Sequence, residues 1–251
     1  MTQEMKKEVI SVEGKAVKFG GTSLCDAIQM KKAAEIVRED RKRRVIVVSA
    51  PGKRTAKDEK MTDHLIRADK TSSETEREAL FSVIQNRFDE MIHALRLPLD
   101  FGMEYKTMRN LRGDALISRG EYFSARIFSV LLGITFLDAA GCIFFRADGT
   151  LDEAKTRAVL SEKLSRAERA VIPGFYGSMP SGDIRLFSRG GSDITGAIVA
   201  DAMDADIYEN FTDVSGFLLA DPNAVACPRT VPVVSYRELR YLSAMGARVL
   251  H

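Results

Sequence analysis

A lysine, two glycines and two hydroxyl residues stand together in the segment Lys18–Ser23, between an apolar pair at residues 16–17 and a helical pattern. Gly20 and Gly21 have no Cβ, so the backbone can approach an anion closely. Where a strand turns into a helix, the first backbone N–H groups of the helix lack partners and attract anions. The segment predicts a phosphate-binding turn in which Lys18 adds positive charge, although an ordinary Gly-Gly turn fits the same pattern.

A second glycine turn, Ser188–Asp193, follows the apolar pair at residues 186–187 and precedes another helical pattern. Arg189 offers a planar fork that suits a carboxylate or a phosphate. Ser192 is a candidate N-cap, and Asp193 stands where an acidic residue stabilises the first turn of a helix. For Ser192 and Asp193, a ligand role and a purely structural role both stay open.

Two more segments carry polar groups at the ends of predicted elements. Glu121 lies in the first turn of a helix that begins near Ser118, where it could cap the helix or hold an ammonium group. The segment Thr212–Gly216 is an Asx-type turn by default. In open α/β sheets, ligands collect beyond the carboxyl ends of the strands, and we expect all four segments to leave from such ends.

Short β-branched runs alternate with helical patterns along the chain, which is typical of a parallel sheet covered by helices. The loop between Ala50 and Met61 is basic, and is either a mobile lid over an anionic ligand or a solvated loop. The basic run at residues 41–44 is expected to complement the dipole at a helix C-terminus. We predict one α/β domain over residues 1–251, with strands at 45–48, 134–137, 170–172, 184–187 and 206–208 and helices at 26–43, 74–95 and 150–165.

Composition narrows the class of partner. The 37 basic and 35 acidic residues give a net charge of +2, so electrostatics favour neither nucleic acid nor a membrane surface as a partner. Cys25, Cys142 and Cys227 form no C-x-x-C pair, which indicates free thiols in a reducing compartment, and the three scattered histidines predict no metal site. We expect a cytoplasmic protein that forms a homo-oligomer.

The order of several motifs resembles that of an aspartokinase from about residue 15 to His251. These motifs are Lys18–Ser23, Val48–Ala50, Gly120–Glu121, Gly174–Phe175, Arg189–Asp193, Thr212–Val214 and Asp221–Pro222. The resemblance implies the amino-acid kinase fold, a three-layer αβα sandwich with a mostly parallel sheet of about eight strands. It also implies transfer of the γ-phosphoryl group of ATP, with Mg²⁺, to the side-chain carboxylate of L-aspartate, the first step toward lysine, threonine and methionine.

The resemblance further implies roles for individual residues. Lys18 and Asp193 would be the catalytic pair, with Asp193 organising Lys18 and the second glycine turn. Glu121 would take the α-ammonium group of the substrate and Arg189 a substrate carboxylate. The remaining substrate pocket would comprise Ser49, Thr62, Phe175, Gly190 and Ser192, and the nucleotide would be bound by Lys18, Gly20, Gly21, Thr212, Asp213 and Arg248.

The match weakens near the end of the chain. Leu218 and Asn223 stand where related enzymes have a tyrosine and an arginine, and Arg248 where they have a lysine. A lost charged contact to the nucleotide costs about 1.5–3 kcal/mol, unless Arg229 or Arg248 compensates. Family members continue past residue 251 into regulatory ACT domains, so we expect a truncated chain without feedback inhibition by lysine or threonine. A catalytically impaired nucleotide- or amino-acid-binding subunit, or a kinase for another amino-acid carboxylate, remain alternatives.

Overall fold

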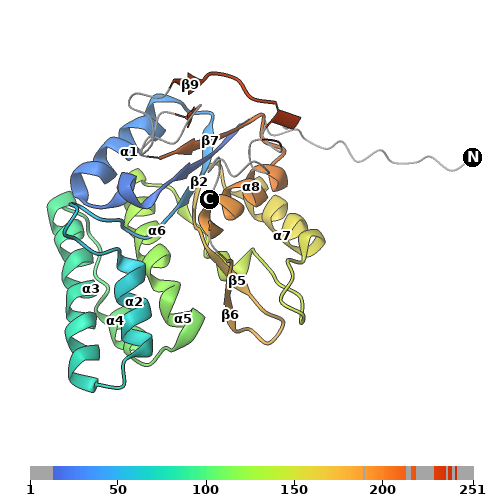
Figure 1. Ribbon diagram of the computed structural model, residues 1–251. Helices are drawn as coiled ribbons and strands as arrows, with labels where there is room; N and C mark the ends of the chain where they lie inside the picture. The colour runs from blue at the N-terminus through green and yellow to red at the C-terminus, as the bar shows by residue number, and fades with distance from the viewer. Residues whose placement is uncertain are drawn as a thin grey trace, which may run out of the picture.

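A parallel sheet of five strands lies at the centre of the structure, a computed structural model that describes residues 14–188, 190–212, 216–218, 229–235, 237–238 and 241. Every strand pair in this sheet is parallel, and the strand order is β3-β4-β2-β1-β7. Helices cover both faces (Figure 1), which confirms the predicted three-layer α/β architecture, with five of the expected eight strands in the described part of the sheet. The strands are β1 (Lys15–Phe19), β2 (Arg43–Val48), β3 (Thr135–Phe136), β4 (Ala170–Pro173) and β7 (Ile207–Phe211).

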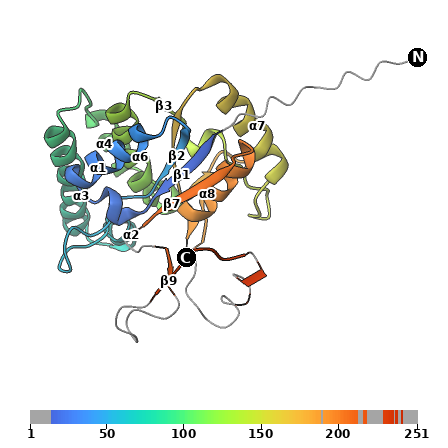
Figure 2. The ribbon, with the colours of Figure 1, turned by 90° about the horizontal axis from the view of Figure 1, so that it is seen from above.

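The two helical layers differ in size. Figure 2 shows the sheet from its edge, with α1, α3, α4 and α6 on one side and α7 and α8 on the other. Two short antiparallel pairs lie outside the main sheet, β5 (Tyr176–Ser178) with β6 (Ile184–Leu186) and β8 (Phe217–Leu218) with β9 (Thr230–Val231). The helices are α1 (Ala27–Glu39), α2 (Met61–Lys70), α3 (Glu74–Leu95), α4 (Gly102–Arg109), α5 (Gly113–Ile117), α6 (Arg119–Leu132), α7 (Glu153–Arg166) and α8 (Gly191–Ala202), with short 3₁₀ helices η1 (Gly21–Leu24) and η2 (Ala139–Gly141).

Alternate residues of the central strands face two separate hydrophobic cores. Val17 and Phe19 of β1 pack with the layer of α1 to α6, whereas Ala16 packs with α7 and α8. In β2, Ile46 and Val48 face the first core and their neighbours the second, as the two-residue period of a strand requires. The same alternation places Lys18 on the α7–α8 side of the sheet.

The predicted end of the first helix is wrong. Helix α1 ends at Glu39, because Asp40 adopts an extended backbone and its side chain accepts a hydrogen bond from the Lys42 N–H at 2.8 Å. Arg43 already belongs to β2. The basic run therefore does not continue the helix, although Arg43 returns to it and donates to the carbonyl of Ile36.

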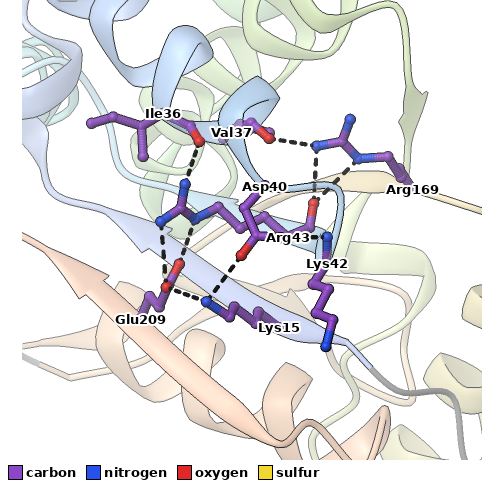
Figure 3. A network of polar contacts seen from close by, with 8 residues as sticks. All are labelled: Lys15, Ile36, Val37, Asp40, Lys42, Arg43, Arg169 and Glu209. Carbon is purple, nitrogen blue, oxygen red and sulfur yellow. Dashed lines mark hydrogen bonds and ion pairs between the residues drawn. The ribbon is translucent and has the colours of Figure 1, made fainter.

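An ion-pair network fastens this end of α1 to the sheet (Figure 3). Glu209 of β7 accepts from Arg43 at 2.6 Å and from Lys15 at 3.0 Å, and Lys15 also contacts Asp40 at 3.0 Å. Arg169 donates to the carbonyls of Val37 and Arg43, both at 3.0 Å. The carbonyl groups of Ile36 and Val37, near the end of α1, thus accept hydrogen bonds from Arg43 of β2 and from Arg169, which precedes β4. These arginines replace the N–H donors that the end of the helix lacks.

Two other expectations about the elements are corrected by the structure. The strand predicted at 184–187 pairs in antiparallel fashion with β5 and lies outside the main sheet, so the second glycine turn leaves from a hairpin. Glu121 follows the short helix α5 rather than a strand. Of the four polar segments singled out in the sequence, the first glycine turn and the segment at Thr212 leave from carboxyl ends of strands in the main sheet, and the other two do not.

Two negative findings concern the described residues only. None of their helices is long and apolar enough to cross a lipid bilayer. Cys25 and Cys142 are buried free thiols, and Cys227 lies outside the residues described.

Candidate functional site

The first glycine turn places its backbone beside a lysine ammonium group. Gly20 follows β1, and its N–H donates to the Phe211 carbonyl of β7 at 3.0 Å. A Cβ added to Gly20 would stand 3.6 Å from the Lys18 Nζ, an ordinary van der Waals contact, so the turn lies directly beside the ammonium group. The turn leads into the 3₁₀ helix η1 and not into α1, whose N-terminus is capped by Asp26. Because the Gly20 N–H is already donated to Phe211, the anion-binding N–H groups expected here are those at the start of η1.

Gly21 is required by packing between two backbone segments. A Cβ on Gly21 would lie 2.8 Å from the Ala50 carbonyl oxygen and 3.1 Å from the Gly52 nitrogen. The Gly52 N–H donates to the Gly21 carbonyl at 2.8 Å. This contact holds the start of the basic loop against the first glycine turn.

Lys18 and Asp193 form an ion pair of 2.9 Å between Nζ and Oδ1, with side chains only 8% and 19% exposed. Asp193 lies in the first turn of α8, as predicted, but Ser192 is not the N-cap. That position belongs to Gly190, whose φ of 77° is in the left-handed region, and Ser192 lies inside the first turn. The pair joins β1 to the second glycine turn.

Asn210 of β7 also contacts Asp193. Its Nδ2 donates to Asp193 Oδ1 at 2.9 Å. Nothing in the sequence pattern identifies Asn210, because its link to Asp193 depends on how β7 and α8 are placed beside β1.

A buried carboxyl group, Glu121, lies on the other side of the sheet. The residue is 4% exposed, and its Oε2 has no hydrogen-bond partner among the described residues. Burial raises the pKa of Glu121 to about 8, although a hydrogen bond from the Ala50 N–H opposes the shift. A buried carboxyl group with an open oxygen can receive a cation or an N–H donor.

Ser49 and Thr62 lie on segments that meet near Glu121. The Ser49 N–H, just after β2, donates to the Phe19 carbonyl at 3.2 Å. Thr62 is in the first turn of α2, whose first residue donates to the Pro51 carbonyl at 3.1 Å. A Cβ on Gly120 would lie 2.8 Å from the Ala50 Cβ, so the start of α6 packs directly against the segment after β2.

Phe175 packs against the second glycine turn in a strained conformation. Its φ is 78°, which a residue with a Cβ rarely adopts, and its N–H donates to the Thr195 hydroxyl at 3.1 Å. A Cβ on Gly191 would lie 2.6 Å from the Phe175 ring. The Gly174 N–H donates to the Val48 carbonyl at 2.9 Å, which fixes this segment at the end of β2.

The structure thus brings most of the predicted site residues to the side of the sheet where the carboxyl ends of the strands lie. Thr212 directly follows β7, beside the first glycine turn. Arg189, Asp213 and Arg248 lie outside the described residues, as does Asn223. The predicted site residues at the edge formed by β1, β2, β4 and β7 are Lys18, Gly20, Gly21, Ser49, Thr62, Glu121, Phe175, Gly190, Ser192, Asp193 and Thr212.

Two further observations concern metal ligands and cavities. Within the described ranges, no group of three or more His, Cys, Asp or Glu residues could hold a metal ion. A surface cavity of about 440 Å³ lies elsewhere, at the C-terminal end of α3, and contains none of the predicted site residues. Its lining comprises Asp89, Ile92, His93, Arg96, Leu97, Leu99 and Asp100.

Comparison with known protein sequences identifies related enzymes. Aspartokinase 3 of Bacillus subtilis is 34% identical over 257 residues, covering 94% of this chain and 57% of the relative. The aspartokinase of Thermus thermophilus is 30% identical over 245 residues, covering 93% of this chain and 51% of the relative. The chain therefore spans about half the length of the curated relatives it matches.

Solved structures agree with the sequence comparison. The chain resembles aspartate kinase from Clostridium acetobutylicum with a TM-score of 0.85 and 42% identity, covering 94% of this chain and 55% of that one. It resembles E. coli aspartokinase III in complex with aspartate and ADP with a TM-score of 0.82 and 25% identity, covering 95% of this chain and 57% of that one. Residues 15–251 match the amino acid kinase family, and the chain belongs to that family.

Proposed function

We propose that the chain transfers the γ-phosphoryl group of ATP to the side-chain carboxylate of L-aspartate, giving 4-phospho-L-aspartate. The observation that carries this proposal is the buried Lys18 ammonium, held by Asp193 beside the first glycine turn. The related proteins support the choice of substrates, because they are aspartokinases and one of them was solved with aspartate and ADP.

The reaction needs charge neutralisation more than it needs a base. An aspartate side chain has a pKa of about 3.9, so the attacking carboxylate is already ionised at neutral pH. One of its oxygens forms a bond to the γ-phosphorus while the bond from phosphorus to the β–γ bridging oxygen breaks, and ADP leaves. Lys18 lowers the repulsion between the carboxylate and the phosphates, and its positioning by Asp193 fixes where that charge lies.

The N-terminus of α8 can supply further positive potential. Helix α8 has 12 residues, and no described side chain caps its N-terminus, which begins at the second glycine turn. Its first N–H groups are suited to an anionic group of the substrate or the nucleotide. Thr212 lies beside the first glycine turn, and we assign Thr212 and Asp213 to the nucleoside side of the nucleotide. Arg248 is a further nucleotide-binding residue in the proposal, and Asp213 and Arg248 both lie outside the described residues.

The Mg²⁺ that accompanies ATP fits a site with few protein ligands. The described residues hold no cluster of three potential ligands, and Mg²⁺ at kinase sites is bound largely by phosphate oxygens and water. When bound, the ion neutralises phosphate charge. In this arrangement Asp193 remains committed to Lys18 and Asn210.

Glu121 and Arg189 together match the charges of aspartate. In our proposal Glu121 receives the α-ammonium group at its open oxygen and Arg189 binds a carboxylate. Ser49, Thr62 and Phe175 would complete the pocket. A substrate with one ammonium and two carboxylate groups needs both kinds of partner.

A coupled assay for ADP release tests the proposal. With L-aspartate and Mg-ATP we expect turnover that Lys18→Ala reduces at least a hundredfold, because the variant loses its fixed charge at the phosphates. Lys31→Ala, at an exposed position of α1, is the matched control and should keep full activity. Nucleotide binding without turnover would instead indicate a binding subunit. Turnover with glutamate, acetylglutamate or carbamate but not with aspartate would show that the phosphoryl acceptor is a different compound.

A further inference from the structure

We propose that Asn210 is a positioning residue that sets the orientation of the Asp193 carboxylate and, through it, the direction of the Lys18 ammonium group. The inference rests on the proposed function, and extends it to a residue outside the set implied by the family resemblance.

One carboxylate oxygen receives both donors. Asp193 Oδ1 lies 2.9 Å from Lys18 Nζ and 2.9 Å from Asn210 Nδ2. Lys18 and Asn210 are register partners in the parallel pair of β1 and β7. Neighbouring side chains from two strands therefore meet the carboxylate of α8 at the same atom.

The amide limits how the carboxylate can engage the ammonium group. A lysine ammonium has three N–H donors, and a carboxylate has two oxygens that can accept them. With Oδ1 shared between the two donors, Lys18 commits one N–H to Asp193 and keeps the others for phosphate oxygens. Without the amide, the Asp193 carboxylate can rotate about its broad terminal torsion and draw the ammonium group toward itself.

Strand β7 also fixes the backbone of Asp193. The Tyr208 hydroxyl, two residues before Asn210, donates to the Asp193 carbonyl at 3.4 Å. A Cβ on Gly196 would lie 2.2 Å from that hydroxyl oxygen, so the glycine leaves room for the tyrosine to reach α8. Asp193 is thus held by β7 at two points, one through its main chain and one through its side chain.

Because Asn210 is exposed, its replacement should affect turnover without much effect on the stability of the fold. Asn210 is exposed, and an exposed hydrogen bond contributes little to folding. The same bond can matter for turnover, because small displacements of a catalytic charge have large effects on rate. Replacement of Asn210 should therefore lower kcat while leaving the melting temperature and the KM values nearly unchanged.

Steady-state kinetics on the full chain test this. We expect Asn210→Ala to lower kcat about tenfold, with KM for aspartate and for ATP within about twofold. Asn210→Gln, which keeps an amide donor on a longer side chain, should recover part of the loss. The control Asn86→Ala, at an exposed position of α3, should change nothing. If the unsubstituted chain turns over and Asn210→Ala keeps its kcat, the inference is wrong.

A second measurement does not depend on turnover. In ¹H–¹⁵N spectra, the side-chain amide signal of Asn210, assigned by its loss in Asn210→Ala, should shift in Asp193→Ala. An unshifted signal would overturn the inference even if the chain proved inactive. Failure of phosphoryl transfer in the unsubstituted chain would contradict the proposed function alone, and the spectra would still decide whether Asn210 is bound to Asp193.

Discussion

At the scale of single residues, the protonation of Glu121 couples the site to pH. Burial raises its pKa to about 8, so in the free protein at pH 7 this carboxyl group is mostly protonated. An ammonium group that binds there favours the ionised form. In our proposal, binding of aspartate below pH 8 therefore includes the loss of a proton from Glu121.

This coupling gives the first prediction. KM for aspartate should fall about tenfold as the pH rises from about 6.5 to 8.5, because less proton release is needed, whereas kcat should change much less. Initial rates across this range, at saturating Mg-ATP, measure both quantities. In Glu121→Gln the remaining KM should be high and independent of pH. A flat KM in the unsubstituted chain would show that Glu121 does not bind the ammonium group.

At the scale of elements, the basic loop after β2 is fastened to the body of the protein. Asp58 contacts the Arg87 guanidinium of α3 at 2.6 Å, and Arg87 donates to the Cys25 carbonyl at 2.8 Å. Burial would raise the pKa of Asp58, but the Arg54 backbone N–H and the charge of Arg87 outweigh it and bring the pKa to about 2. The loop is therefore anchored at Asp58 and is neither wholly solvated nor wholly free.

The second prediction concerns this anchor. The variant Asp58→Asn leaves the guanidinium of Arg87, whose side chain is 3% exposed, without its charged partner, and should lower the free energy of unfolding by about 3 kcal/mol at pH 7. Because the folded pKa of Asp58 lies below its ordinary value, the contribution is full above pH 4 and is lost as the pH falls through 2. Urea unfolding measures the change. Asp201→Asn, which breaks an exposed pair with Arg157, should cost less than about 1 kcal/mol.

At the scale of the whole molecule, Glu209 links three strands and a helix end. It accepts from Lys15 of β1 and Arg43 of β2, and Arg43 also reaches the end of α1 (Figure 3). Burial raises the pKa of Glu209, but hydrogen bonds from Arg43 and Lys15 outweigh it and lower the pKa below its usual value. This network lies away from the carboxyl ends of the strands, so it stabilises the sheet without touching the site.

The third prediction follows from that separation. Glu209→Ala should lower the free energy of unfolding by about 1–3 kcal/mol near pH 7, since two partly buried cations lose their common acceptor. The difference from the unsubstituted chain should shrink as the pH falls through the lowered pKa of Glu209. Turnover per folded molecule should stay within about threefold. Glu162→Ala, which removes an exposed pair with Arg166, should change stability by no more than about 0.5 kcal/mol. Equal effects of the two substitutions would contradict the role of the network.

The sequence predicted the ends of α3 and the two glycine turns, which depend on neighbouring residues. Its local patterns did not predict contacts between residues that are distant in the sequence. The apolar stripe of α3 predicted both of its ends, Glu74 and Leu95, because helix periodicity and capping depend on residues that are close in the sequence. The two glycine turns were recognisable for the same reason. The contact between Asn210 and Asp193 was not, because it depends on strand register. Ser192 has good N-cap chemistry, but Gly190 can adopt the left-handed backbone that the turn requires.

The alternation of β1 has a consequence for the path of the reaction. Lys18 projects toward α8, whereas Glu121 lies in the layer of α6, so the ammonium group and the carboxyl group lie on opposite faces of the same sheet. In our proposal, the aspartate spans the end of the sheet, with its ammonium group at Glu121 on one side and its side-chain carboxylate near Lys18 on the other. A slip of β1 by a single residue would reverse both faces at once, turning Lys18 into the wrong core and Val17 and Phe19 out of theirs. The register of β1 that buries Val17 and Phe19 in one core is thus also the register that directs the Lys18 ammonium group toward Asp193.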